Sequence, residues 1–253
     1  MLKNAIGTKK RIYFLDAFRG FLLLNMICYH TLWNLQNVYS VVQNFTDSSW
    51  GFLYQQFICC SFIFLSGFCF KMGRSRLLGG ILVLLGALVV RLVTQVFSPI
   101  TPIKFGVLFA IGSSTIICYS FDLIFGKLRF SRRANLVLFL LFMALFALVR
   151  FVPEGYFGVY GLGGRIDASL YSSNFGVPFG FPTSSFYSTD YFSLIPWLFL
   201  FVAGVFAFGA VDVKSIAPRR SIRVKPLEFL GRYSLIVYLL HQPLIMGVLY
   251  VVM

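Results

Sequence analysis

The chain has 253 residues, of which 58% are hydrophobic and only 12% are charged. Soluble domains carry about 25% charged residues, so this composition excludes an ordinary soluble protein and predicts an all-α protein whose helices cross a lipid bilayer. The formal net charge of +14 would suggest a nucleic-acid partner in a soluble chain. In a membrane chain the positions of the cations matter more than their sum, and we expect no nucleic acid.

Seven apolar segments are long enough to be predicted as transmembrane helices. In chain order they cover residues of about 12–35, 52–70, 77–97, 105–125, 135–152, 191–211 and 230–251. The connection at 153–190 is rich in Gly, Ser, Pro, Phe and Tyr. A connection of this length is usually functional, and its aromatic content favours a packed lid or an acceptor-binding loop. The sequence therefore predicts a polytopic helical bundle formed by a single domain, 1–253.

The cations gather in every second connection between these helices. Sixteen of the 22 fall there: Lys3, Lys9, Lys10, Arg11, Lys71, Arg74, Arg76, Lys127, Arg129, Arg132, Arg133, Lys214, Arg219, Arg220, Arg223 and Lys225. Basic connections stay on the cytoplasmic side of a membrane. This alternation predicts a multi-pass protein of the plasma membrane with its N-terminus in the cytoplasm.

The first apolar segment carries three groups that a membrane helix rarely contains, Asp16, Arg19 and His30. Each costs at least about 2.5 kcal/mol at membrane depth, which argues for a buried polar site. Arg19 and His30 are eleven residues apart, roughly three helical turns, so both side chains should project from one face about 16 Å apart along the axis. Asp16 and Arg19 would then lie toward the cytoplasm and His30 toward the exterior.

Each of these residues has a structural and a functional interpretation. Arg19 could form an ion pair with Asp16 at spacing i, i+3, or its guanidinium could bind a phosphate group with two hydrogen bonds. His30 could be a hydrogen-bonding strut between helices, or it could take a proton from an attacking amine or hydroxyl. A phosphate-bearing donor held at Arg19 with its reactive end near His30 has the shape of a coenzyme A thioester.

The last apolar segment has a polar stripe of its own. Ser234, Tyr238 and His241 are spaced i, i+4, i+7 and should share one face, which Arg232 precedes and Gln242 follows. We expect this stripe to line the wall opposite His30. Tyr238 and His241 could there steady the carbonyl group of a thioester.

Three further ionisable residues have open assignments. Asp47 and Asp190 precede predicted helices at the outer side, where each could be a helix N-cap or could orient His30 or an acceptor. Arg91 lies in the segment 77–97 and could extend to the membrane interface or supply positive charge to the buried site. Asp122 lies near a basic connection and should pair with it.

Small residues mark two places where helices should approach closely. Ser66 and Gly67 belong to the second segment, and the patch Gly112-Ser-Ser-Thr115 belongs to the fourth. The five cysteines and two histidines show no metal-ligand spacing, so we expect neither a metal site nor a disulfide framework.

Five stretches of the chain, in order, resemble one family. They are Leu15-Asp-Ala-Phe-Arg-Gly20 followed by His30, Phe62-Ile-Phe-Leu-Ser-Gly67, Phe105-Gly-Val-Leu-Phe-Ala-Ile-Gly112, Phe186–Trp197 and Gly231-Arg-Tyr-Ser-Leu-Ile-Val-Tyr-Leu-Leu-His-Gln-Pro243. They resemble the compact bacterial group of the heparan-α-glucosaminide N-acetyltransferase catalytic-domain family, which is related to the membrane acyltransferase-3 proteins. The resemblance implies transfer of an acyl group from cytoplasmic acetyl-CoA to an acceptor on the outer side.

The chain departs from the family pattern at three places. Relatives often have His where this chain has Phe109, and the lysosomal members have Asn in place of His30. Their catalytic His lies on the first luminal loop, roughly where Asp47 stands here. Either His30 or Asp47 could therefore be the general base, and we favour His30.

The leading hypothesis is a membrane acyltransferase. In it, Asp16, Arg19, Arg91, Arg232, Ser234, Tyr238, His241 and Gln242 contact the acyl-CoA donor, while His30, Asp47 and Asp190 act on an extracytoplasmic carbohydrate or cell-envelope acceptor. The alternative is a transporter of a small solute or lipid precursor that uses the same buried polar face. The sequence identifies neither the acceptor nor the acyl chain length, and a homodimer is left open.

Overall fold

The computed structural model describes residues 12–73, 75–97, 102–125, 130–159, 162–211 and 223–253. The chain divides into two compact units, one formed by Met1–Gly51 with Val213–Met253 and the other by Phe52–Asp212. We call them the terminal unit and the central unit and describe each by itself. Most of the basic connections, among them 1–11, 126–129 and 212–222, lie outside the described residues.

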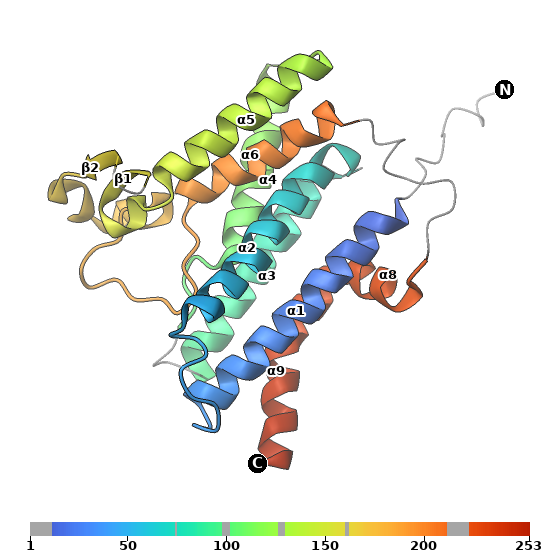
Figure 1. Cartoon of the computed structure of the whole chain (residues 1–253), viewed down its shortest axis with the longest axis vertical. Helices are drawn as coiled ribbons and strands as arrows, with labels where there is room; N and C mark the ends of the chain where they lie inside the picture. Colours follow the sequence, from blue (N-terminus) through green and yellow to red (C-terminus); the bar gives the residue numbers. More distant parts are fainter. Residues whose placement is uncertain (1–11, 74, 98–101, 126–129, 160–161, 212–222) are drawn as a thin grey trace. The chain divides into compact units, whose positions relative to one another are not determined.

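Among the described residues, the terminal unit contains the helices α1 (Tyr13–Asn37), α8 (Lys225–Arg232) and α9 (Ser234–Val252). Figure 1 shows α8 and α9 following one another along α1, and α1 packs against both. The helix predicted at 12–35 is confirmed. The helix predicted at 230–251 is confirmed as α9, which begins four residues later because Tyr233 at the end of α8 leaves the helical conformation (φ −101°, ψ 27°). The short polar helix α8 precedes it.

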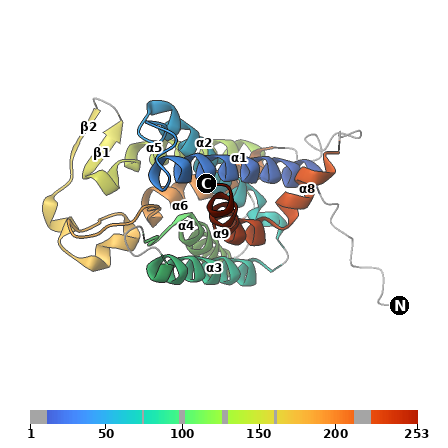
Figure 2. The ribbon, with the colours of Figure 1, turned by 90° about the horizontal axis from the view of Figure 1, so that it is seen from below.

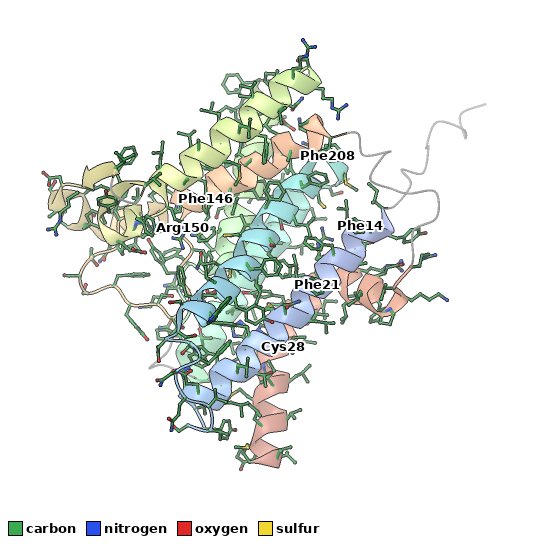
Figure 3. All side chains as sticks on the ribbon, in the orientation of Figure 1. Phe14, Phe21, Cys28, Phe146, Arg150 and Phe208 are labelled. Atoms are coloured by element: carbon green, nitrogen blue, oxygen red, sulfur yellow. The ribbon has the colours of Figure 1, made fainter. Side chains whose placement is uncertain are left out.

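On α1, buried residues and exposed residues each recur every seven positions. Leu15, Leu22 and Tyr29 are buried, whereas Phe14, Phe21 and Cys28 are exposed and lie along one side of the helix in Figure 3. Seven residues are about two helical turns, so each set forms one stripe. The exposed stripe is apolar, as expected for a surface that faces lipid.

The central unit holds five further helices: α2 (Ser49–Cys69, which begins at the boundary), α3 (Arg76–Phe97), α4 (Val107–Ile124), α5 (Arg132–Val149) and α6 (Leu194–Ala210). A short 3-10 helix, η1 (Phe70–Met72), follows α2. All five predicted helices are confirmed within a few residues at each end. The pairs α3 with α4, α5 with α6, and α4 with α6 pack together.

Small residues allow two close crossings, as predicted. A Cβ on Gly67 would lie 1.9 Å from the Phe201 carbonyl oxygen, so α2 and α6 touch backbone to backbone. A Cβ on Gly112 would lie 2.8 Å from Leu84 of α3. Close backbone approach of this kind is how membrane helices gain packing energy in the absence of a hydrophobic driving force.

An ion pair joins the same end of α3 and α4. Arg76, the first residue of α3, donates a hydrogen bond to Asp122, and the two side chains keep only 17% and 27% of their exposure. The guanidinium of Arg76 also lies 4.8 Å from the centre of the Phe70 ring. The prediction that Asp122 pairs with the basic connection is confirmed.

The connection between α5 and α6 has regular structure on both sides of residues 160–161, which lie outside the described residues. It contains the 3-10 helices η2 (Val152–Glu154), η3 (Ala168–Tyr171) and η4 (Asn174–Phe179) and an antiparallel hairpin of β1 (Tyr156–Val159) and β2 (Leu162–Arg165). The hairpin packs at the end of α5, as Figures 1 and 2 show. The described part of this connection packs as expected, and two four-residue strands leave the chain mostly helical, consistent with the all-α prediction.

Five helices of the described chain are long and apolar enough to cross a membrane: Ser49–Met72, Arg76–Phe97, Val107–Ile124, Arg132–Glu154 and Ser234–Val252. These helices make the chain a membrane protein. Two predicted spans are not among them, since α6 is a shorter apolar helix and α1 carries the polar residues. The count of seven spans therefore stays a prediction.

Candidate functional site

The Asp16 to Gly20 stretch forms the crossing between α1 and α8. A Cβ on Gly231 of α8 would lie 1.8 Å from the carbonyl oxygen of Asp16, and a Cβ on Gly20 would lie 2.0 Å from that of Leu227. Because neither glycine has a side chain, the two backbones touch. This contact fixes the position of α8 relative to Asp16 and Arg19 of α1.

Arg19 forms the ion pair that its spacing predicted. Its guanidinium nitrogen lies 3.7 Å from the Asp16 carboxylate, and the two side chains are 22% and 12% exposed. That distance exceeds a hydrogen bond, so the pair holds the guanidinium without using all of its five N–H donors. Both interpretations of Arg19, structural and anion-binding, are compatible with this geometry.

The two histidines of the chain lie side by side. The ring of His30 on α1 is 4.8 Å from the ring of His241 on α9, measured between centroids. Tyr29 meets the His30 ring edge-on at 5.7 Å, and Tyr238 lies 5.3 Å from His241. Residues 211 positions apart in the sequence therefore form one aromatic and ionisable cluster, which we call the histidine pair.

His241 has a defined tautomer. Its Nδ1 contacts the backbone carbonyl oxygen of Tyr238. A carbonyl oxygen can only accept, so Nδ1 carries the proton and Nε2 carries a free lone pair. Nε2 is buried and has no hydrogen-bond partner among the described residues. A ring held through one nitrogen, with a basic second nitrogen left over, is the arrangement that proton-transfer catalysts use.

One turn beyond His30 lies a polar residue that the sequence analysis missed. Asn34 is fully buried, and its Oδ1 accepts a hydrogen bond of 3.0 Å from Nε2 of Gln242, the neighbour of His241. Within the described chain, Nδ2 of Asn34 and Oε1 of Gln242 are buried without partners. Each such atom costs about 1–3 kcal/mol. The spacing of four residues from His30 was the available signal.

Asp47 is held at the outer end of α1. Its carboxylate accepts a hydrogen bond of 3.0 Å from Gln36, whose own oxygen accepts from the backbone of Thr46. The expectation that Asp47 caps the next helix is wrong, because Ser48 accepts the hydrogen bond from Gly51 at the start of α2. Asp47 is exposed, and its catalytic role stays a prediction.

Asp190 belongs to the central unit and does not cap its own helix, which begins four residues later at Leu194. Its carboxylate instead accepts a hydrogen bond from the backbone N–H of Val107, the first residue of α4. Burial raises the pKa of Asp190 to about 6, and the hydrogen bond from Val107 opposes that rise. The segment is tied down further where Phe192 donates to the Phe105 carbonyl.

The remaining predicted donor contacts are more exposed. Arg91 is exposed on α3, which favours the interpretation in which it extends to the membrane interface. Arg232 is exposed in the last turn of α8, and Ser234 is half-buried at the start of α9. Their roles toward a donor stay predictions.

The sequence analysis also missed one cation, which lies in the central unit. Arg150, at the end of α5 and labelled in Figure 3, donates a 2.8 Å hydrogen bond to Gln56 of α2. Its guanidinium also lies 4.9 Å from the centre of the Trp197 ring, a cation–π distance. A cation at the end of an otherwise apolar helix gave no pairing signal in the sequence.

Comparison with protein families gives one match. The model of the family described as "Heparan-alpha-glucosaminide N-acetyltransferase, catalytic" matches residues 11–243. The chain belongs to this family. The match runs through the histidine pair and through both units, and family membership makes the chain a membrane transferase of the acetyltransferase type. No curated protein and no solved structure matches the chain significantly.

Proposed function

We propose that this protein transfers an acetyl or other acyl group from cytoplasmic acyl-CoA to a saccharide-type acceptor outside the membrane. The histidine pair carries the proposal: two imidazole rings 4.8 Å apart, one with a buried free lone pair, in a chain of an acetyltransferase family. Family membership favours this function over the transporter.

The donor is held at the α1–α8 crossing. Arg19 binds a phosphate group of acyl-CoA with the N–H donors that its 3.7 Å pair with Asp16 leaves unused. Arg232, exposed in the last turn of α8, adds positive charge to this end of the terminal unit. About 16 Å of helix separates Arg19 from His30, which leaves room for the arm of acyl-CoA to run along α1. The positive-inside rule places this end in the cytoplasm, with the chain in the plasma membrane.

The chemistry occurs at the histidine pair. An amine or hydroxyl of the acceptor attacks the thioester carbonyl carbon, and His30, as general base, takes the proton from the attacking atom. The carbon–sulfur bond then breaks, and the thiolate of CoA takes up the proton. Two imidazolium cations 4.8 Å apart would repel each other, so the pair holds one proton at a time. His241, oriented by the Tyr238 carbonyl, is the neighbour that shares it.

The acceptor approaches from the other end of α1. Asp47 is fixed there by Gln36 and could orient either the acceptor or His30. The role of Asp190 and of the 153–190 connection in acceptor binding stays a prediction from the sequence. In this proposal 1–253 acts as one catalytic domain, and a homodimer is not required.

A thermal-shift titration with acetyl-CoA tests the donor site. Acetyl-CoA should raise the unfolding temperature of the purified protein, and Arg19→Ala should abolish the rise. Arg165→Ala, an exposed arginine in β2, is the matched control and should keep it. If acetyl-CoA stabilises neither the wild-type protein nor Arg165→Ala at any concentration, the chain does not bind this donor, and the transporter hypothesis is favoured.

Transfer from acetyl-CoA tests the base. His30→Ala should reduce transfer by ~10²- to 10⁴-fold while the protein keeps its unfolding temperature. Asp47→Asn in the same assay decides between the two candidate bases. Full activity of His30→Ala with loss of activity in Asp47→Asn would move the role of base to Asp47.

A further inference from the structure

The hydrogen bond between Asn34 and Gln242 leaves a donor and an acceptor unused. Asn34 is 0% exposed, and both unused atoms are buried. The result does not depend on how the two amide groups are oriented. If both were rotated, Asn34 would donate to Gln242, and the unused atoms would again be one N–H group and one carbonyl oxygen.

The position of this amide pair relates it to the reaction. Asn34 lies four residues after His30, about 6 Å further along α1, and Gln242 directly follows His241. The amide pair therefore adjoins the histidine pair on the side away from Arg19. That side faces the incoming acceptor in the proposed function, on which this inference rests.

The chemistry of the two unused atoms selects the ligand. A carboxylate or phosphate could accept from the N–H group but could not donate to the carbonyl, and an ammonium group could do only the reverse. A hydroxyl group also donates and accepts, but from a single atom, whereas a secondary amide offers its N–H and its carbonyl oxygen as two separate groups. A secondary amide therefore matches the two separate unused atoms of the pair.

We propose that Asn34 and Gln242 form a clamp for a secondary amide of the substrate. An acetamido group of an N-acetylated sugar at the acceptor side is the favoured source, because the clamp lies beyond His30 from Arg19. The arm of CoA also contains secondary amides, so the donor is the second source. The clamp selects its ligand by neutral hydrogen bonds and does not require a charged acceptor.

The double variant Asn34→Leu with Gln242→Met tests the clamp, because it replaces both amides by apolar side chains of similar size. Removing both partners of a buried hydrogen bond together can be neutral or stabilising, and it also removes the two unused atoms. The unfolding temperature should therefore stay equal or rise. A fall of several degrees would show that the two residues are a structural strut and would overturn the proposal.

Binding identifies the source, with N-acetyl-D-glucosamine and CoA as separate probes of the full-length protein. The double variant should bind N-acetyl-D-glucosamine at least about tenfold more weakly, the ratio expected for lost hydrogen bonds. CoA affinity should stay unchanged, because the clamp assigns Gln242 to the acceptor and no longer to the donor contacts expected from the sequence. Loss of CoA affinity alone would assign the clamp to the donor. D-glucose lacks the amide, so its affinity for the double variant should differ from its affinity for the wild-type protein by less than twofold.

Asn37→Leu is the control variant. Asn37 lies three residues further along α1 and is exposed, and within the described part of the chain its side chain donates to the carbonyl of Trp33 in its own helix. It should leave both affinities unchanged. If neither probe distinguishes the double variant from the wild-type protein, water alone fills the pair and the clamp is refuted. Binding of N-acetyl-D-glucosamine without any binding of CoA would leave the clamp standing while contradicting the proposed function.

Discussion

Gly231→Ala should separate the two helices that position Arg19. The new Cβ would lie 1.8 Å from the carbonyl oxygen of Asp16, where ordinary contact begins at 3.4 Å. The atom that it meets belongs to the backbone of α1, so no side-chain rotation can relieve the clash. The backbones must part by about 1.6 Å, which is a large shift in an interior packed at crystal density.

The cost can be estimated from overpacking in protein cores, which destabilises by about 1–3 kcal/mol. We expect the upper end, about 3 kcal/mol, because backbone meets backbone. For a chain of this size that corresponds to a fall in the unfolding temperature of roughly 6–12 °C. Thermal unfolding in one detergent, followed by the reaction of the four half-buried cysteines with a thiol-reactive dye, measures it.

Gly247→Ala is the matched control, since Gly247 lies in α9 and a Cβ there meets nothing within 4 Å. Alanine is better than glycine in a helix by about 0.5–1 kcal/mol, so this variant should be as stable as the wild-type protein or slightly more so. Equal unfolding temperatures for the two variants would refute the backbone contact between α1 and α8.

Two further predictions concern the central unit. The pKa of Asp190 is about 6, above its ordinary value of 3.8. The folded protein therefore keeps the carboxyl protonated at pH values where the unfolded chain has lost the proton, and stability should fall as pH rises from about 4 to 6. Asp190→Asn, which can still accept from Val107, should flatten that fall in a pH series of unfolding temperatures. Asp122→Asn should leave Arg76 without its carboxylate and cost about 3 kcal/mol, the low end for a buried pair, because the side chains keep 17% and 27% exposure. Asp122→Leu combined with Arg76→Met should recover most of that loss, and a double variant as unstable as Asp122→Asn would contradict the reasoning.

Local patterns in the sequence predicted most of the helices. Apolar length located α1 to α6, and glycine or serine within an apolar run located the close crossings, since both signals act on residues that are near in sequence. The break at Tyr233 was missed because apolar length alone cannot tell one helix from two. The hairpin after α5 was missed because four-residue strands carry too little alternation to stand out.

The histidine pair follows the expectation that the stripe with His241 lies opposite His30, since the two rings are 4.8 Å apart; the amide pair beside it was not expected. The cost of ionisable groups in a membrane singled out Arg19, His30 and His241. Asn34 escaped because a neutral amide in a helix has many ordinary explanations, and its partner Gln242 lies 208 positions away. Asp190 was expected to cap the helix next to it, but it accepts from Val107 at the start of α4, 83 positions earlier in the sequence. Only tertiary structure decides which helix end a carboxylate reaches.

The spacing along α1 makes one last property testable, the independence of its two ends. Arg19 and His30 are about 16 Å apart along the axis, and sites more than about 7–10 Å apart with no shared partner have additive effects. Arg19→Ala should therefore raise KM for acetyl-CoA, His30→Ala should lower kcat, and the double variant should show the product of both. His30 and His241 are in contact and hold one proton together, so His241→Ala should add little to His30→Ala. Additive effects within the histidine pair would mean that each ring acts alone, which would refute a shared proton.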